Sequence, residues 1–362
     1  MTASSGGPEA FGGAGDGGSA AAPARPGRVV QWAQEHGEVG GVLTSHRQMT
    51  EVLRAGGHDV SYVDTGSGSR AVRAVPSLWR RRALHVLHIT RLARAAQLAP
   101  LLATLPGTRA LVLHSGSTAG QVAAMSPQRA RAVLGVLRTF DELWVVNAAI
   151  REVLPPDLAA RTTVVTPFDA RAVAARGSVR RDPHALVVAT NAGLAHYNAR
   201  LVLDALPLVR ERWPDATLRV LAYGRETPEL AALRADAAST PGVELSFDLG
   251  GEQVSEVLAG AGVFLRPTSW DGDSVIVREA LALGARVVAS DLAPRPRGVE
   301  LVPLEPQALA AAVLDGGVRS DGAGLVDTTL AEAATRTLAR IGPLTGRGGS
   351  RRSWGGGQGG NR

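Results

Sequence analysis

Residues 264–291 alternate between strand and helix patterns, and this alternation restricts the fold more than any other stretch of the chain. An apolar run ends at Arg266, and residues 268–274 form a polar loop. A helical pattern fills residues 275–283, and a second apolar run follows at residues 286–289. Two buried strands joined by one helix are expected to run parallel, because the helix provides the crossover connection that parallel strands need. The stretch therefore predicts an α/β fold.

The same alternation occurs along most of the chain and predicts two domains. Strands alternating with helices indicate doubly wound, Rossmann-like sheets, which bind ligands at the carboxyl ends of their strands. We expect two such domains facing each other across an interdomain cleft. The predicted segments are a disordered tail (1–27), an amino-terminal Rossmann-like domain (28–168), a linker (169–182), a carboxy-terminal Rossmann-like domain (183–324), a carboxy-terminal helix (325–345) and a disordered Gly/Arg tail (346–362).

Charge and aromatic content argue against nucleic acid as a partner. The formal net charge is +6, and every basic residue is arginine. Four of these arginines lie after residue 346, in a tail without acidic residues, so the folded part is close to balanced. A nucleic-acid binder is expected to carry a basic face, commonly with aromatic residues, and aromatic residues make up only 4% here. The absence of lysine beside abundant alanine and glycine is typical of a high-GC bacterial genome.

Cysteine content and hydropathy bear on the location. The chain has no cysteine, which excludes disulfides and thiolate metal sites and is compatible with a reducing compartment. No apolar run reaches the ~18 residues of a membrane span, and no secretory signal is visible. We expect a cytoplasmic protein, with peripheral contact at the inner face of the membrane left open.

The loop and helix of residues 268–283 contain the best candidate site. Ser274 stands where it can cap the helix, whose free N–H groups and positive dipole end suit a phosphate. Asp271 lies in the loop and Glu279 lies about one turn into the helix, where a carboxylate can accept hydrogen bonds from sugar hydroxyls. The pattern predicts a site suited to a phosphate and to sugar hydroxyls.

Several motifs in order resemble the retaining, group 1 type glycosyltransferases of family 4, which have the GT-B fold. The signature reads Asp271-GDSVIVR-Glu279 followed by ALALGARVVASD, with Asp in place of the usual first Glu. Gly40-Gly41 precedes a helix, and Leu113-His114-Ser115-Gly116 stands where the family has a His after its strand. The resemblance covers roughly residues 29–314. It implies that the domain of residues 28–168 binds the acceptor and that the domain of residues 183–324 binds the nucleotide sugar.

The resemblance implies a retaining glycosyltransferase, of hexosyltransferase type, that uses a nucleotide-diphosphate sugar as donor and needs no cofactor or metal. The acceptor would be a glycan, a glycolipid or other lipid-linked molecule, or a small molecule. It also implies that Glu279 binds the ribose and that Asp271 contacts hydroxyls of the donor sugar. The backbone of Gly272, Asp273, Ser274 and Val275 would contact the sugar and the diphosphate. Gly40 and Gly41 would lie close to the diphosphate, and His114 would lie near the transferred sugar.

One departure from the family affects the diphosphate. The family has an Arg and, five residues later, a Lys, whereas this chain places Ala192 and Tyr197 near those positions. Arg266 is the first candidate to replace them, and His196 could also donate. The departure leaves open a non-catalytic GT-B protein that binds a sugar nucleotide or acts as an accessory subunit. A sugar-nucleotide epimerase of the same fold is a further alternative.

Three other patterns have competing interpretations. Asp271-Gly-Asp273 spells a metal-binding DxD, but its surroundings are not those of the enzymes that use it. Residues 66–71 imitate a dinucleotide fingerprint but are expected to form a flexible loop. Residues 79–82 (Trp-Arg-Arg-Arg) could rest on an anionic membrane or form a solvated turn. We expect the acceptor to meet first-domain loops at residues 66–82 and 115–121.

Overall fold

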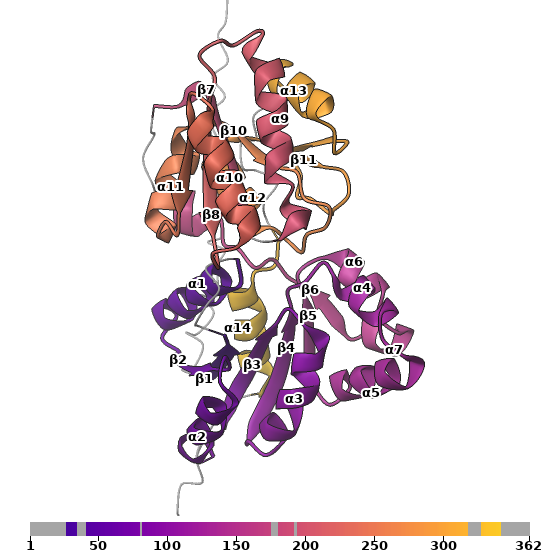
Figure 1. Cartoon of the computed structure of the whole chain (residues 1–362). Helices are drawn as coiled ribbons and strands as arrows, with labels where there is room; N and C mark the ends of the chain where they lie inside the picture. Colours follow the sequence, from indigo (N-terminus) through magenta and orange to yellow (C-terminus); the bar gives the residue numbers. More distant parts are fainter. Residues whose placement is uncertain are drawn as a thin grey trace, which may run out of the picture.

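The structure is a computed structural model that describes residues 27–34, 41–79, 82–174, 180–191, 194–317 and 327–341. The predictions for Gly40, for Ala192 and for nearly all of the two tails lie outside these residues. The described chain forms two bodies, one above the other in Figure 1, and each is built around a parallel six-stranded sheet.

The first sheet has the strand order β2-β1-β3-β4-β5-β6, with every pair parallel. The order reverses between β1 and β3, which is the switch point where doubly wound sheets bind ligands. Its strands are β1 (Arg28–Ala33), β2 (Asp59–Asp64), β3 (Ala83–Ile89), β4 (Gly107–Leu113), β5 (Glu142–Val145) and β6 (Thr162–Val164).

The second sheet has the order β12-β11-β10-β7-β8-β9 and is also entirely parallel. Its order reverses between β10 and β7, so the carboxyl end of β10 lies at the second switch point. Its strands are β7 (Asp182–Asn191), β8 (Thr217–Tyr223), β9 (Val243–Phe247), β10 (Ala261–Arg266), β11 (Arg286–Ser290) and β12 (Val299–Val302).

Helices cover both sheets, because the crossovers between parallel strands lie on the sheet faces. Those of the first domain are α1 (Gly41–Ala55), α2 (Gly68–Leu78), α3 (Leu92–Ala103), α4 (Thr118–Ala123), α5 (Pro127–Leu137), α6 (Ala148–Glu152), α7 (Pro156–Ala159) and, at the chain end, α14 (Leu330–Ile341). The connection to the second domain holds α8 (Arg171–Ala174). The second domain has a 3-10 turn η1 (Ala195–Tyr197), α9 (Ala199–Arg210), α10 (Pro228–Ser239), α11 (Gly251–Gly260), α12 (Val275–Ala282) and α13 (Pro306–Leu314).

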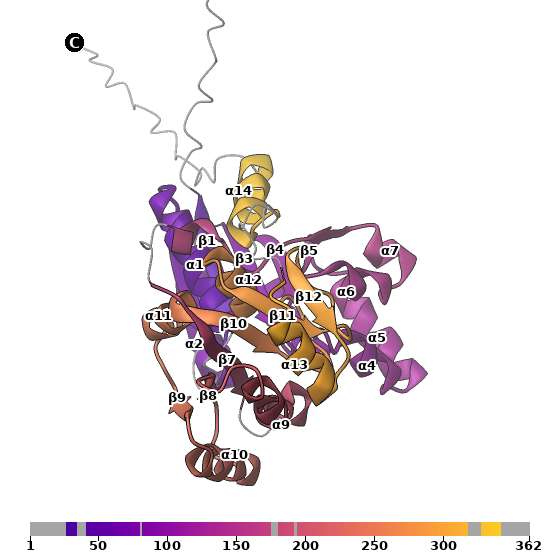
Figure 2. The same cartoon turned by 90° about the horizontal axis from the view of Figure 1, so that it is seen from above.

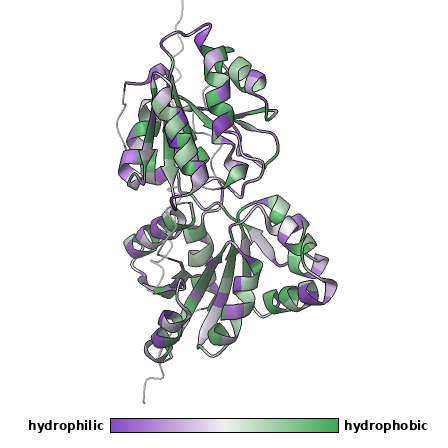
Figure 3. Cartoon of the chain, in the orientation of Figure 1, coloured by the Kyte–Doolittle hydropathy of each residue, from purple (hydrophilic) through white to green (hydrophobic). Residues whose placement is uncertain are grey.

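The central strands are almost fully apolar because helices cover both of their faces. All seven residues of β3 and all six of β10 are buried. Figure 3 shows this hydrophobicity along the strands of both domains. Trp32 and Trp144 are among the largest fully buried side chains of the first core. Burial on this scale makes each sheet a stable platform for the loops at its carboxyl edge.

The chain returns to the first domain at its end. Helix α14 packs against α1 and β3, and its Leu330 and Leu338 belong to the first hydrophobic core (Figures 1 and 2). The outgoing and returning segments pair through a parallel bridge between Thr166 and Thr329. The Thr166 N–H donates to the Thr328 carbonyl at 2.8 Å. The two crossings between the domains, which we call the hinge, are therefore held together.

Two predictions about loops were wrong. Residues 68–78 form helix α2 rather than a flexible loop, because Ala71 and Leu78 lie on one face and are buried in the first core. Residues 118–123 form helix α4, whose Thr118 hydroxyl donates to the Ser115 carbonyl at 2.7 Å. The glycines, serines and the internal Pro76 obscured the helical pattern of the first stretch.

Candidate functional site

The centre of the candidate site is an ion pair at the switch point of the second sheet. Arg266 ends β10, its side chain is only 6% exposed, and its Nε donates to Asp271 Oδ2 at 2.9 Å. A guanidinium N–H also donates to the Ala189 carbonyl on β7 at 3.4 Å. Burial disfavours both charges, but each stabilises the other. The pKa of Arg266 is therefore raised and that of Asp271 is lowered well below its usual range.

A second arginine, which the sequence analysis did not single out, binds the same carboxylate. Arg295 lies in the loop after β11, and its side chain is 1% exposed. Its Nη1 donates to Asp271 Oδ2 at 2.9 Å and its Nη2 donates to Thr268 Oγ1 at 2.5 Å. The remaining oxygen of Asp271 accepts the N–H of Gly272 at 3.0 Å. Asp271 thus joins two cationic groups from neighbouring strands.

Aromatic residues surround this ion cluster. The Arg266 Cζ lies 4.7 Å from the centroid of the Tyr197 ring, within the range of a cation–π contact. The Tyr197 and Tyr223 hydroxyls are 2.9 Å apart. His196 stacks on Trp270 with ring centroids 3.8 Å apart, and Trp270 remains 41% exposed. The predicted donor His196 therefore lies beside the cluster, with its ring against an accessible aromatic surface.

The start of α12 differs from the prediction in one respect. Ser274 occupies the N-cap position, but its side chain makes no capping hydrogen bond. Its hydroxyl is buried and has no hydrogen-bond partner among the described residues. Its φ and ψ of −72° and 106° are those of extended backbone, and the loop holds the hydroxyl away from the helix N–H groups. A buried orphan hydroxyl at a helix N-terminus can donate to an anionic ligand.

Asp273 is held by an ion pair of its own. Both of its oxygens lie 2.7 Å from Arg278 Nε, and Oδ2 also accepts from the Thr166 hydroxyl across the domain boundary at 3.2 Å. Arg278 Nη1 lies 2.9 Å from Asp327 in the returning segment. Asp273 thus links the two domains, and no metal-binding group of acidic and histidine side chains occurs among the described residues.

Glu279 is buried on α12 and points to the neighbouring helix α11. Its Oε1 accepts a hydrogen bond from the Ser255 hydroxyl. The Ser255 hydroxyl oxygen also lies 3.0 Å from the Gly251 carbonyl oxygen, and Ser255 is 3% exposed. Sequence analysis did not connect Ser255 with Glu279, because they lie on different helices. The serine therefore contributes to the orientation of the carboxylate.

Two glycines bring the domains into direct backbone contact at the site. A Cβ atom on Gly116 would lie 1.7 Å from the Asp271 carbonyl oxygen, and one on Gly272 would lie 2.3 Å from the His114 carbonyl oxygen. A Cβ atom on Gly41, at the start of α1, would meet Val275 Cγ2 at 3.2 Å. The structure thus brings most of the described site residues from both domains to one interdomain face.

His114 belongs to a group of buried histidines beneath this face. Its Nε2 lies 3.0 Å from His88 Nδ1 at the end of β3, and the two rings are stacked. His46 on α1 meets the His88 ring edge-on at a centroid distance of 6.3 Å. Burial lowers the pKa of His114 to about 3 and that of His46 to about 4. His114 is therefore neutral at physiological pH and acts as a hydrogen-bonding group.

The histidine pKa values predict acid destabilisation. Burial lowers the pKa of several histidines below 6.5, so that the unfolded chain binds protons that the folded protein does not. Their stabilising effect is complete above pH 6.5 and is lost as the pH falls toward 4, by about 1.4 kcal/mol per pH unit for each fully neutral histidine. The residues are His46, His58, His85, His88, His114 and His196.

Chemical denaturation at pH 7.5, 6.0 and 5.0 measures this loss. The free energy of unfolding is expected to fall across the series, and His114→Gln is expected to reduce the slope. His184→Gln serves as a control, because that side chain is 30% exposed and pairs with Asp215 instead of with the buried group. Equal free energies of unfolding at pH 7.5 and 5.0 would contradict the account.

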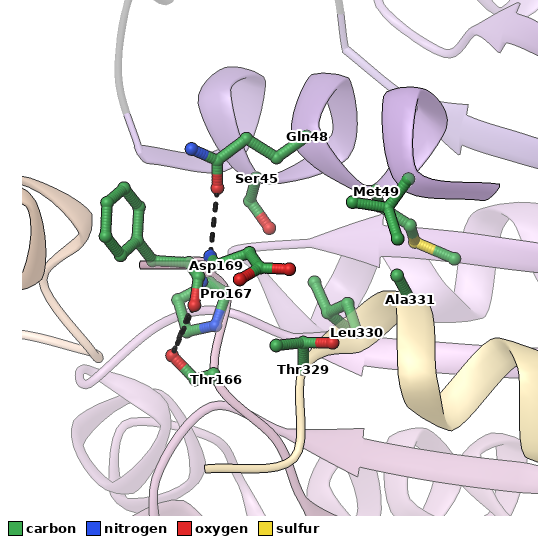
Figure 4. A pocket seen from close by; sticks show the side chains of 11 residues that line it. Ser45, Gln48, Met49, Thr166, Pro167, Asp169, Thr329, Leu330 and Ala331 are labelled. Atoms are coloured by element: carbon green, nitrogen blue, oxygen red, sulfur yellow. Dashed lines mark hydrogen bonds between the residues drawn. The ribbon is translucent and has the colours of Figure 1, made fainter. Parts of the chain in front are cut away.

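A small cavity lies at the hinge rather than at the ion cluster. It is lined by α1, the outgoing segment and the start of α14, and its volume is about 10 Å³ (Figure 4). The Asp169 N–H donates to Gln48 Oε1 at 3.1 Å beside it. A volume of this size holds at most one water molecule. We assign it to the hinge and not to substrate binding.

Sequence analysis missed Arg295, Gly116 as a contact residue, Ser255 and Trp270. The sequence could have indicated Arg295, because it follows the strand next to β10 and parallel strands end at the same edge of the sheet. It could have indicated Gly116 as well, because this residue follows β4 close to the predicted site residue His114. Arg200, in the first turn of α9, pairs with Asp236 on the surface and is 67% exposed.

Comparison with known proteins supports the fold and part of the sequence interpretation. Residues 183–315 match the family model of the Glycosyl transferases group 1. The sequence matches no curated protein significantly. No helix in the described part of the chain is both long and apolar enough to cross a membrane.

Solved structures with the same architecture cover most of this chain. The Anabaena protein HepE in complex with UDP has a TM-score of 0.58 at 12% identity, covering 86% of this chain and 95% of its own. An E. coli trehalose-6-phosphate structure bound with UDP-2-fluoro glucose has a TM-score of 0.56 at 12% identity, covering 87% and 95%. Sucrose-phosphate synthase from Thermosynechococcus elongatus has a TM-score of 0.53 at 16% identity, covering 87% and 94%. The predicted GT-B fold is confirmed.

Proposed function

We propose that the protein is a retaining glycosyltransferase of family 4 that moves a sugar from a nucleotide-diphosphate sugar to an acceptor. The observation that carries the proposal is the place of Arg266. Its guanidinium lies over the Tyr197 ring, at the position where the resemblance expects a lysine. Arg266 on β10 therefore offers a positive charge beside Tyr197 in η1, which supports activity despite the missing lysine.

The residues of the site have distinct tasks in this proposal. Negative charge grows on the diphosphate as its bond to the sugar breaks, and Arg266 together with the N–H groups at the start of α12 stabilises it. Glu279, oriented by Ser255, accepts hydrogen bonds from the ribose. Neutral His114 hydrogen-bonds a hydroxyl of the transferred sugar. Attack on the same face through an oxocarbenium-like state follows from the retaining chemistry that the resemblance implies.

The similar structures suggest a donor to test, and the first-domain surface suggests where the acceptor binds. Two similar structures hold UDP or UDP-2-fluoro glucose, which makes UDP-sugars the first donors to test. A glycan, a glycolipid or a small molecule is proposed as the acceptor, which would meet the first domain near α2 and α4. A cytoplasmic location, with peripheral membrane contact near Trp79, remains a prediction. Trp79 is 61% exposed, although its indole N–H donates to the Thr104 carbonyl at 2.5 Å.

Binding of nucleoside diphosphates is expected to stabilise the protein and to depend on Glu279. A ligand at 100 times its Kd adds about 2.7 kcal/mol to the free energy of unfolding, so millimolar UDP should raise the melting temperature. Glu279→Ala is expected to abolish the shift because the ribose loses its acceptor. Glu256→Ala is the matched control, since Glu256 is exposed on α11 beside Ser255. Thermal-shift assays with UDP, GDP and ADP measure the effect, and no shift with any of them would count against the proposal.

The second candidate function is a non-catalytic GT-B protein that binds a sugar nucleotide or a partner. The hydrogen bond between Tyr197 and Tyr223 favours it, because it fills the lysine position with a neutral pair. Such a protein would show the thermal shift but no release of nucleoside diphosphate. Turnover assays therefore separate the two functions.

A further inference from the structure

The arrangement of Arg295 is unusual for a residue that only stabilises a loop. It is anchored in the loop between β11 and β12, yet its guanidinium reaches Asp271 and Thr268, both in the β10–α12 loop. Its Nε is buried and has no hydrogen-bond partner in the part of the chain that the structure describes. An unpartnered buried donor destabilises the protein, so a ligand that accepts a hydrogen bond from it gains binding energy.

Two buried arginines share the single carboxylate of Asp271. Arg266 and Arg295 both donate to Oδ2, so the negative charge of one carboxylate is divided between two guanidinium groups. Asp273, two residues later, binds Arg278, which also pairs with Asp327. An anion that accepts from Arg266 and Arg295 would add to the negative charge that these two groups now share.

The same place offers hydrogen-bond donors for that anion. The buried Ser274 hydroxyl is unpartnered among the described residues, and it lies at the N-terminus of α12, just after the loop that carries Asp271. The positive end of the helix dipole adds to the two guanidinium charges. A single carboxylate would neutralise only one charge. A diphosphate carries enough charge and enough acceptor oxygens for both arginines and the serine.

We propose that Arg295 is the second cation of the diphosphate site and that Asp271 is the counter-ion shared by Arg295 and Arg266. This inference rests on the proposed function, since it names the residues that replace the missing Arg and Lys of that function. Asp271 orients both guanidinium groups and competes with the diphosphate for them. Its own contact with the donor sugar is limited to the oxygen that accepts from Gly272.

Calorimetric titration with inorganic pyrophosphate tests the site without a nucleotide or a sugar. Arg295→Gln is expected to weaken pyrophosphate binding at least 10-fold relative to the wild type. Arg297→Gln, an exposed arginine in the same loop, is the matched control and is expected to bind as the wild type does. Asp271→Asn is expected to tighten binding about 10-fold, because the competing carboxylate is lost, and to lower the melting temperature of the ligand-free protein.

Two results would overturn the proposal: wild-type affinity in Arg295→Gln, or unchanged or weaker affinity in Asp271→Asn. If Arg295→Gln does not fold, Arg295→Lys replaces it. Lysine keeps the charge but cannot bind Asp271 and Thr268 with a planar fork, so a several-fold loss is expected, and wild-type affinity would again refute the role.

Turnover separates this inference from the proposed function. If pyrophosphate binding depends on Arg295 but the protein cleaves no nucleotide sugar, the anion site is supported and the glycosyltransferase function is refuted. If the protein cleaves a nucleotide sugar but Arg295→Gln binds pyrophosphate as the wild type does, the function is supported and the role of Arg295 is refuted.

Discussion

Replacing Gly116 with alanine is expected to lower turnover by about 100-fold, the scale on which misplacement by ~1 Å acts on catalysis. The new Cβ atom would lie 1.7 Å from the Asp271 carbonyl oxygen, so the two backbones must separate by about 1 Å or more. The separation would move His114 and the first domain away from Arg266 and the start of α12. Steady-state kinetics measure the loss, and small-angle scattering measures the expected opening of the domains.

Matched glycine variants isolate the effect of this contact. Gly272→Ala disrupts the same contact from the second domain, because its Cβ atom would lie 2.3 Å from the His114 carbonyl oxygen. A similar loss of turnover is expected. Gly120→Ala is the control, because a Cβ atom there meets nothing within 4 Å. Nucleoside diphosphate binding to the second domain is expected to survive in Gly116→Ala and Gly120→Ala, because both residues lie in the first domain. If Gly116→Ala kept wild-type turnover, the backbone contact between Gly116 and Asp271 would not be required for the reaction.

Replacing Arg266 with glutamine is expected to lower turnover by about 10- to 100-fold. One charge-assisted hydrogen bond to the diphosphate contributes about 1.5–3 kcal/mol, and each 1.4 kcal/mol corresponds to a factor of ten in rate. The effect should be larger on kcat than on KM, since the charge on the leaving group grows toward the transition state.

An exposed arginine of the same sheet provides the comparison for Arg266→Gln. Arg219 on β8 pairs with Glu244 on the surface and is 40% exposed, so Arg219→Gln is expected to retain wild-type turnover. Arg266→Lys is expected to recover part of the activity, because it restores the charge without the planar fork. Equal turnover in Arg266→Gln and the wild type would show that the cation is dispensable.

The second domain was predictable from sequence because its strands and helices have strong, separate periodicities. The strand ending at Arg266, the loop and the helix starting at Val275 occur in the structure as predicted. Helix α2 was missed because its signal is tertiary: Ala71 and Leu78 are buried by the sheet, whereas the local sequence is rich in turn residues.

The contacts of the site were less predictable than its location. Asp271, Arg266 and Glu279 were identified from the motif, but their partners Arg295 and Ser255 come from other loops and helices. Such contacts depend on how neighbouring strands end and how helices pack, which local patterns do not encode. The contact between Gly116 and the Asp271 backbone likewise depends on how the two domains pack against each other. Composition limited the chemistry, since a chain without lysine must use arginine or a helix dipole for a phosphate.

Release of nucleoside diphosphate from a panel of UDP-, GDP- and ADP-sugars, with mixed saccharide and lipid-linked acceptors, tests the central claim most directly. The account predicts release and sugar transfer from at least one donor by the wild-type protein, with strong losses in Arg266→Gln and Gly116→Ala. Nucleotide sugars that bind and stabilise the protein but are never cleaved would contradict it and leave a GT-B binding protein.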